Sequence, residues 1–218
     1  TDSLLRQGMR LHDEGKYREA LECYQKVLET EPDNAEAMYE MAYTFMSTGD
    51  YKRAVQYAKN SIRKGKVPYA GSYAVWGSSL DELGQREKAL KVFDEGMKNF
   101  PDDHLLAYNK GLTLYRMKRF REAEAVLCHS VQLRPSHPGS HLLLAYTEAE
   151  LGNRVKAMLP LYFFLLIESR TERSKTVWEM LASLQVKGMT QEKTGKISLR
   201  IPSREDTDSL GVLDMTVS

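Results

Sequence analysis

The sequence predicts an all-α protein in which helix–turn–helix units repeat along the chain. Small residues, turn glycines and closing prolines each return at a nearly constant interval, and apolar residues within each unit recur at helical spacing. One such unit cannot bury its own apolar face. Neighbouring units are therefore expected to stack into a solenoid with a continuous core.

The repeat period is about 34 residues. Successive members of one alanine column lie 34, 35, 34 and 34 residues apart, and two other columns keep the same steps. The alanine column is Ala20, Ala54, Ala89, Ala123 and Ala157, the small-residue column is Gly8, Ala42, Gly77, Gly111 and Ala145, and the turn column is Gly15, Gly49, Gly84, Lys118 and Gly152. Pro32, Pro101 and Pro135 close three of the units. The agreement between columns predicts five repeats, at about 1–34, 35–69, 70–103, 104–137 and 138–171.

Each repeat is expected to contain two helices joined by a turn. In the first repeat, Leu4, Gly8 and Leu11 follow the helical spacing of the first helix. The small residues should let two helix backbones approach closely, and the turn glycines should supply the left-handed backbone that ends a helix. The residue after each closing proline is expected to cap the next helix, which predicts Asp33, Asp102 and Ser136 as caps.

The fifth repeat departs from the pattern and predicts the end of regular stacking. Phe164 stands where repeats two to four carry Ser61, Gly96 and Ser130. A final helix is expected at about 171–187, with one side formed by Val177, Trp178, Leu181 and Leu184. Under this helix Tyr162, Phe163 and Phe164 would be core, and the alternative is that they form a dimer or partner surface.

The repeat columns resemble those of the tetratricopeptide repeat family, which has small residues at the eighth and twentieth positions and proline at the thirty-second. The resemblance extends over about residues 1–169. It implies a right-handed α-solenoid over 1–188, including the final helix, followed by an irregular tail over 189–218. Besides Phe164, two positions differ from the family pattern: Lys66 replaces the proline of repeat two, and Glu148 replaces a large apolar residue.

The resemblance also implies a binding surface, because the first helices of such repeats line a concave face. The corresponding positions are Leu5, Met9, His12, Glu36, Tyr39, Glu40, Tyr43, Met46, Ser78, Asp81, Tyr108, Asn109, Leu112, Tyr115, Arg116, Leu142 and Tyr146. This face is rich in tyrosine and modestly acidic, which favours a basic or neutral segment of another protein. Alternatively, some of the tyrosines only pack between repeats.

The sequence lacks the motifs of other function classes. No phosphate-binding glycine loop or nucleophile elbow is found, so no catalytic or cofactor site is expected. His137 and His141 are four residues apart, but Pro138 and Gly139 lie between them, so a turn pair without a metal is predicted. The net charge of +1 argues against nucleic-acid binding, despite two basic clusters around Arg63 and Arg119. The most apolar stretch, 157–167, is too short to span a membrane. A soluble protein is expected, cytoplasmic, or periplasmic if a leader preceded Thr1.

The tail leaves the repeat pattern. Ile197, Leu199 and Ile201 alternate with polar residues, which predicts a strand. The tail either docks on the solenoid or on a neighbouring copy, or it packs loosely. The predicted function is non-enzymatic protein binding as an adaptor or assembly scaffold. The alternatives are a self-assembling structural protein that uses the repeat-five helix and the tail as a homodimer contact, and a regulatory domain of a larger enzyme system.

Overall fold

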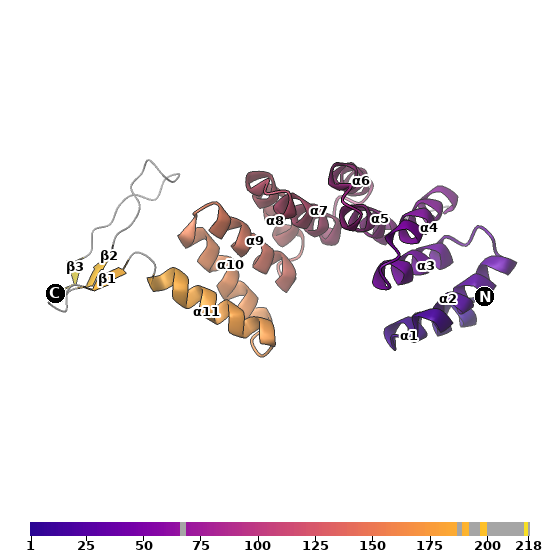
Figure 1. The fold of residues 1–218 in the computed structure, drawn as a ribbon, viewed down its shortest axis with the longest axis horizontal. Coiled ribbons are helices and arrows are strands. Elements are labelled where there is room, and N and C mark those ends of the chain that lie inside the picture. Colours follow the sequence, from indigo (N-terminus) through magenta and orange to yellow (C-terminus); the bar gives the residue numbers. More distant parts are fainter. Residues whose placement is uncertain (66–68, 187–188, 192–196, 200–215, 218) are drawn as a thin grey trace. The chain divides into compact units, whose positions relative to one another are not determined.

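The computed structural model describes residues 1–65, 69–186, 189–191, 197–199 and 216–217, and its described part contains eleven helices (Figure 1). This confirms the predicted all-α repeat solenoid. The helices pair in order along the chain as the repeats require, and the eleventh follows the fifth pair. Their bounds are α1 Asp2–Asp13, α2 Tyr17–Thr30, α3 Ala35–Ser47, α4 Tyr51–Lys64, α5 Ala70–Glu82, α6 Arg86–Asn99, α7 His104–Arg116, α8 Phe120–Leu133, α9 Pro138–Glu150, α10 Arg154–Ile167 and α11 Glu172–Val186.

The tail, expected to be irregular, contains three short strands in the part that the structure describes. β1 (Met189–Gln191) pairs antiparallel with β2 (Ile197–Leu199), and β2 pairs antiparallel with β3 (Thr216–Val217). The strand expected from the alternating residues is confirmed at Ile197 and Leu199. Ile201 lies outside the described residues, as do Lys66 and the predicted domain boundary after residue 188.

The helices form two compact units, Thr1–Pro135 with α1–α8 and Ser136–Ser218 with α9–α11 and the strands. In the first unit each helix packs on the next, and α1, α3, α5 and α7 also contact one another in order. The first helices of four repeats therefore make one continuous layer, called here the first-helix layer. In the second unit α9 packs on α10, and α10 packs on α11.

The turn column has left-handed backbone, as predicted. Gly15, Gly49, Gly84 and Gly152 have φ between 74° and 81°, and Lys118 has φ of 59°. This conformation lets the chain bond back to the helix that it leaves. In repeat four, for example, the N–H of Arg119 donates to the carbonyl of Leu114 at 3.0 Å. Lys118 adopts the same conformation with a side chain present, which costs about 1 kcal/mol relative to glycine.

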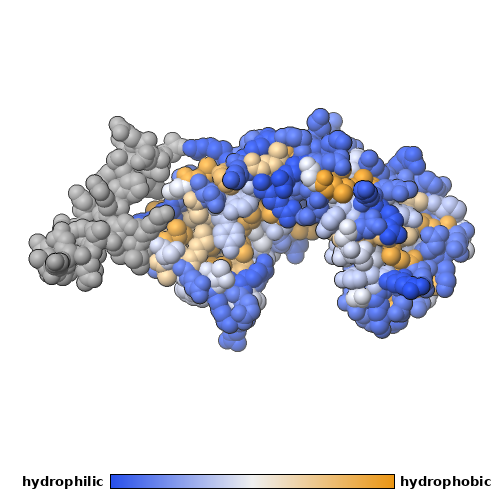
Figure 2. All heavy atoms as spheres, viewed as in Figure 1, coloured by the Kyte–Doolittle hydropathy of each residue, from blue (hydrophilic) through white to orange (hydrophobic). Residues whose placement is uncertain are grey.

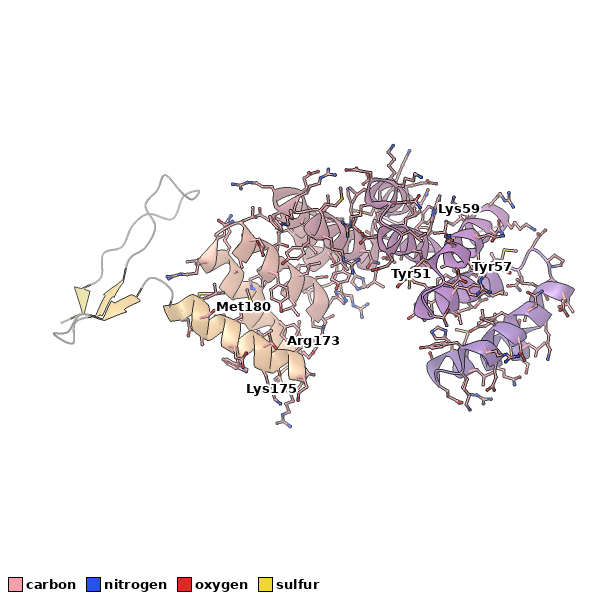
Figure 3. The ribbon with its side chains drawn as sticks, in the orientation of Figure 1. Tyr51, Tyr57, Lys59, Arg173, Lys175 and Met180 are labelled. Atoms are coloured by element: carbon pink, nitrogen blue, oxygen red, sulfur yellow. The ribbon has the colours of Figure 1, made fainter. Side chains whose placement is uncertain are left out.

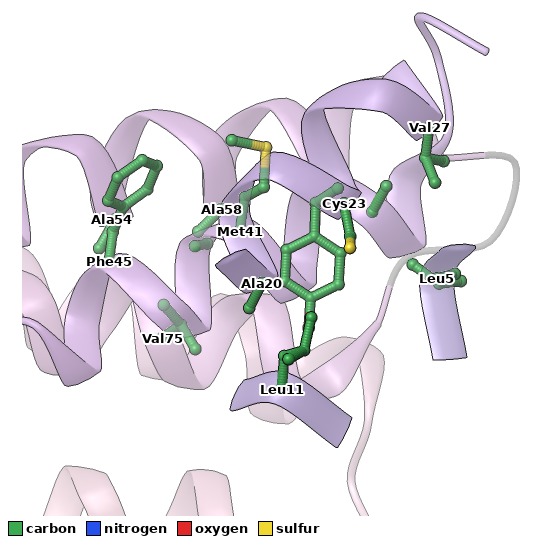
Figure 4. Close-up of a cluster of buried hydrophobic side chains, with 13 residues drawn as sticks. Leu5, Leu11, Ala20, Cys23, Val27, Met41, Phe45, Ala54, Ala58 and Val75 are labelled. Atoms are coloured by element: carbon green, nitrogen blue, oxygen red, sulfur yellow. The ribbon is translucent and has the colours of Figure 1, made fainter. Parts of the chain in front are cut away.

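The small-residue column brings the two helices of a repeat together. A Cβ added at Gly77 would lie 2.4 Å from the ring of Phe93, and one added at Gly8 would lie 2.4 Å from the ring of Tyr24. Large side chains of the second helix therefore fill the space that glycine leaves on the first. In repeat two this pair is Ala42 and Ala58, both fully buried. Figure 4 shows the surrounding core, where side chains of α3 and α4 meet.

The predicted helix caps are wrong by one residue. Asn34 accepts from the N–H of Ala37 at 2.9 Å, Asp103 accepts from the N–H of Leu106 at 3.0 Å, and His137 accepts through Nδ1 from the N–H of Ser140 at 3.2 Å. The proline and the residue after it both lie in the turn. The cap is therefore the second residue after the proline.

In the second unit α11 covers one side of α10. Phe164 is fully buried with Val177 and Leu181. The guanidinium of Arg173, which Figure 3 labels on α11, lies 5.4 Å from the ring centre of Phe164. The core prediction is confirmed for Phe164 alone, because Tyr162 and Phe163 are exposed.

Trp178 corrects the prediction for the face of α11. Val177, Leu181 and Leu184 form its buried stripe at helical spacing, whereas Trp178 is 57% exposed. One residue along a helix turns the side chain by about 100°, which places Trp178 beside the stripe.

Candidate protein-binding site

Four aromatic rings form a stacked row on the first-helix layer. The ring centre of His12 lies 4.8 Å from that of Tyr43, Tyr43 lies 6.3 Å from Tyr39, and Tyr39 lies 6.1 Å from Tyr69. Neighbouring ring planes differ by 22°, 15° and 14°. His12, Tyr43, Tyr39 and Tyr69 are called here the aromatic row. It joins α1, α3 and the residue that precedes α5, so the first two repeats contribute to one surface.

The backbone and its hydrogen bonds position these rings. Tyr39 and Tyr43 are four residues apart on α3, so they share one helix face. Nδ1 of His12 lies 2.8 Å from the hydroxyl of Thr44, and this hydrogen bond joins α1 to α3. A Cβ added at Gly71 would lie 2.7 Å from the ring of Tyr39, so glycine at the second residue of α5 makes room for that ring.

Acidic groups lie beside the aromatic row. Glu40 is 8% exposed, and burial, with a further effect of Glu36 and Asp13, raises its pKa to about 7. Burial, followed by the charge of Glu40, raises the pKa of Tyr39 to about 12. Because the Glu40 carboxyl titrates near neutrality, a cation bound nearby would favour its ionised form.

The predicted contact residues of the first two repeats differ in how far their side chains are exposed. Met9, Glu36 and Tyr43 are exposed, and Tyr39 and Met46 are half-buried. The buried members are Leu5, His12 and Glu40. Leu5 is part of the hydrophobic core, so its side chain supports the layer from beneath.

In repeats three and four, an ion-pair network joins α5 to α7. Asp81 is 4% exposed and accepts from the hydroxyl of Thr113 at 3.1 Å, from Arg116 at 2.9 Å and from Arg86 at 2.9 Å. Arg116 also donates to Glu82 at 2.7 Å. Two predicted contact residues, Asp81 and Arg116, are thus used to hold repeats together, and their charges offset one another.

The remaining predicted positions lie outside the aromatic row. Tyr115 packs against Phe120 at 5.5 Å between ring centres. The other half-buried members of the first unit are Ser78, Tyr108, Asn109 and Leu112. In the second unit Leu142 packs against the core, and Tyr146 is half-buried.

Sequence reasoning missed two rings of this surface. Tyr69 extends the row, and Tyr17 meets the edge of His12 at 5.1 Å between ring centres. Tyr69 ends repeat two, which is one residue longer than the other repeats, so no repeat position predicts where its ring lies. An aromatic residue directly before the first helix of a repeat was the available clue.

The histidine pair and the basic clusters take part in the fold. His137 caps α9, and His141 stacks on Phe163 at 5.3 Å. Lys64 pairs with Asp33 at 2.6 Å, and Arg119 pairs with Glu122 at 2.6 Å. Among the residues that the structure describes, no group of three His, Cys, Asp or Glu could hold a metal ion. No helix of this described part is both long enough and apolar enough to cross a membrane.

Known proteins share these repeats. Two models described as tetratricopeptide repeat match residues 11–63 and 75–138. The chain is 34% identical over 99 residues to the photosystem I assembly protein Ycf3 of Synechococcus sp. (strain CC9902), a match that covers 41% of this chain and 57% of that protein. It is 30% identical over 129 residues to Ycf3 of Cyanophora paradoxa, covering 52% of this chain and 75% of that protein.

The fold matches a solved repeat protein over most of the chain. The crystal structure of TTC0263, a thermophilic TPR protein of Thermus thermophilus, superimposes with a TM-score of 0.69 at 23% identity and covers 85% of this chain and 98% of that one. The repeat columns, the paired helices and the matched residues agree on one assignment. The chain belongs to the tetratricopeptide repeat family.

Proposed function

We propose that this chain is a non-enzymatic protein-binding module, an adaptor or assembly scaffold, which holds a segment of another protein on its first-helix layer. The observation that carries the proposal is the aromatic row. Its rings are ordered by mutual stacking, and Tyr43 and Tyr69 remain 39% and 41% exposed. A tyrosine held in place loses little rotamer entropy on binding, which suits it as an anchor.

The charges beside the row favour a basic or neutral occupant. Glu36 is exposed, and both Glu36 and Asp13 lie close enough to Glu40 for their charges to act on its carboxyl. An arginine of an extended segment or a helix would stack on the tyrosine rings while it approaches these carboxylates. The proposal also includes the other predicted contact positions of this layer, which are Ser78, Asp81, Tyr108, Asn109, Leu112, Tyr115 and Arg116. Leu142 and Tyr146 lie on α9 in the second unit, and a contact role for them is proposed for that unit alone.

The relatives support an assembly role in general terms. The Ycf3 proteins are named as photosystem I assembly proteins. The chain spans 57% of the length of the Synechococcus protein.

The test is a crosslinked pull-down from the native cell's extract, followed by titration of the purified partner segment. The variant Tyr43→Ala/Tyr69→Ala should weaken binding at least about tenfold while helicity stays unchanged, because two anchor rings are lost. Tyr51→Ala, on α4, is the matched control and should bind like the parent (Figure 3). Equal binding by the double variant and the parent would place the contact surface elsewhere.

A second role, association of the chain with itself, is favoured by a different observation. α10 exposes large apolar side chains, among them Leu159 at 62% and Leu166 at 80%. A large apolar patch on the surface of a folded domain marks an interaction site.

A further inference from the structure

The outward face of α10 carries an apolar stripe. Val155, Leu159, Tyr162 and Leu166 are 58%, 62%, 39% and 80% exposed and are called here the α10 stripe. Their separations of four, three and four residues place them on one side of the helix. Figure 2 shows hydrophobic residues on the surface of the part formed by α9–α11.

The same positions are polar in repeats one to three, whereas repeat four has Arg121, Ala125, Cys128 and Gln132 there. The residues in repeats one to three that match the α10 stripe are all exposed, and all are charged or glutamine. They are Arg18, Glu22, Gln25 and Glu29, then Lys52, Gln56, Lys59 and Arg63, then Glu87, Lys91, Asp94 and Lys98. The repeat fold therefore does not require apolar side chains at these positions. The apolar stripe of repeat five indicates that another chain or segment packs against it.

We propose that the occupant is a second copy of this chain, with two α10 helices packed antiparallel about a two-fold axis. This inference deepens the second role proposed above and is independent of the aromatic row. A two-fold contact uses the same patch on both copies, so one apolar stripe is sufficient to form it.

The spacing of the stripe is self-complementary. In an antiparallel pair centred between residues 160 and 161, Val155 lies opposite Leu166 of the second copy, and Leu159 lies opposite Tyr162 of the second copy. Each contact then joins a smaller side chain to a larger one. The four-three-four spacing is also the seam that packs two helices at a shallow angle.

The charges at the ends of α10 favour the antiparallel direction. The helix begins with Arg154 and has no acidic residue in its first turn, an arrangement that the helix dipole disfavours. Antiparallel pairing brings Arg154 of each copy to the carbonyl end of the other helix, where the helix dipole favours a cation. Glu168, which follows the last residue of α10, is already paired with Arg173 of its own copy.

The available area suits a dimer. Together with Phe163 and Ile167 on the adjacent side of α10 and Trp178 on α11, which are 44%, 40% and 57% exposed, the stripe makes up the exposed apolar surface of this unit. Taking about 150–250 Å² for a fully exposed aromatic side chain and somewhat less for an aliphatic one, this surface offers on the order of 700 Å² per copy. A stable interface of standard size buries about 800 Å² per partner.

Sedimentation velocity of the full chain from about 1 to 200 μM is the test. The parent should form a dimer. Leu159→Glu and Tyr162→Lys should each raise the dimer dissociation constant at least about 100-fold, because each buries an unpaired charge against apolar side chains. Gln56→Glu changes the matching position of repeat two and should leave the dimer intact. Circular dichroism of every variant checks the fold. Tyr162→Lys also removes the hydrogen bond that the Tyr162 hydroxyl accepts from Gln185 of α11 at 2.8 Å, so Leu159→Glu is the single variant that changes the stripe alone.

The double variant Leu159→Glu/Tyr162→Lys decides the direction of pairing. In the antiparallel dimer each new glutamate faces a new lysine, so association should return. In a parallel dimer like charges would meet, and the double variant would stay monomeric, which would overturn the proposed pairing.

Two other outcomes would overturn the proposal. In the first, the parent stays monomeric at 200 μM, and α10 is protected from hydrogen exchange until residues 189–218 are removed. The tail would then be what covers the stripe. The other is a dimer that persists in Leu159→Glu. Titration of a partner segment against the monomeric variants tests the aromatic row independently, because their aromatic rows are unchanged.

Discussion

Replacing Gly77 by alanine should destabilise the protein, although alanine is the better helix former. Gly77 lies inside α5, where alanine would ordinarily add about 1 kcal/mol of stability. The new Cβ would lie 2.4, 2.5 and 2.8 Å from three carbons of the Phe93 ring, which is fully buried. The two effects therefore oppose each other.

The steric effect is the larger one. Overpacking a core costs about 1–3 kcal/mol, and contact with three atoms of an enclosed ring places this case at the upper end of that range. After the gain in helix propensity is subtracted, the free energy of unfolding should fall by about 2 kcal/mol. For a chain of this size that corresponds to a midpoint about 4–8 °C lower.

A double-mutant cycle measured by urea unfolding isolates the cause. Phe93→Leu alone should cost about 1–2 kcal/mol because it leaves a cavity. In Gly77→Ala/Phe93→Leu the added methyl group fills part of that space, so the coupling energy should favour the double variant by about 2 kcal/mol. The fifth repeat already contains this combination as Ala145 and Leu161, both fully buried.

Two results would refute this reasoning. If Gly77→Ala is as stable as the parent or more stable, helix propensity outweighs packing at this position. If the two substitutions add without coupling, the ring of Phe93 is not what excludes a side chain at residue 77.

Two further predictions concern the turn column and the buried carboxyl. Lys118→Gly should raise the free energy of unfolding by about 0.5–1 kcal/mol, because glycine removes the strain of φ 59° and only part of that gain is lost to the greater freedom of the unfolded chain. Urea unfolding measures it, with Gly84→Ala as the opposite control, and a less stable Lys118→Gly would contradict the strain argument. Glu40 has a pKa raised to about 7 in the fold, against 4.5 as its ordinary value, so the fold binds its proton more tightly. Stability from this group should be fully present below about pH 4.5 and should be lost as the pH rises through about 7. Glu40→Gln should remove that loss and be more stable than the parent at pH 8 but not at pH 4.5, and thermal unfolding at both values would show whether it does.

The sequence was sufficient to predict the repeat fold because the repeat imposes the same local demand five times. Each turn needs left-handed backbone, and each helix pair needs a small residue at the close contact. The turn column, which includes Gly15, and the small-residue column, which includes Gly77, can therefore be recognised from the sequence without knowledge of distant contacts. Lys118 stands at the same repeat position as the turn glycines, and its backbone has their left-handed conformation.

The candidate site could be predicted only in part. The repeat position identified Tyr39 and Tyr43 as members of the first-helix layer. Whether a residue there is exposed depends on its neighbours, and Asp81 shows this, since Thr113, Arg86 and Arg116 enclose it. Tyr69 had no repeat position to identify it, because it lies beside the extra residue of repeat two.

By itself, the sequence determined the family, the period and the pairing of helices, since these follow from short-range spacing along one chain. Only the tertiary structure decided which side chains meet across repeats. The stacking of His12 on Tyr43, the burial of Glu40 and the exposure of the α10 stripe each depend on distances between residues of different helices. Helical periodicity gives the direction of a side chain from its own helix axis, and the surface available to a partner is set by what the neighbouring helices leave uncovered.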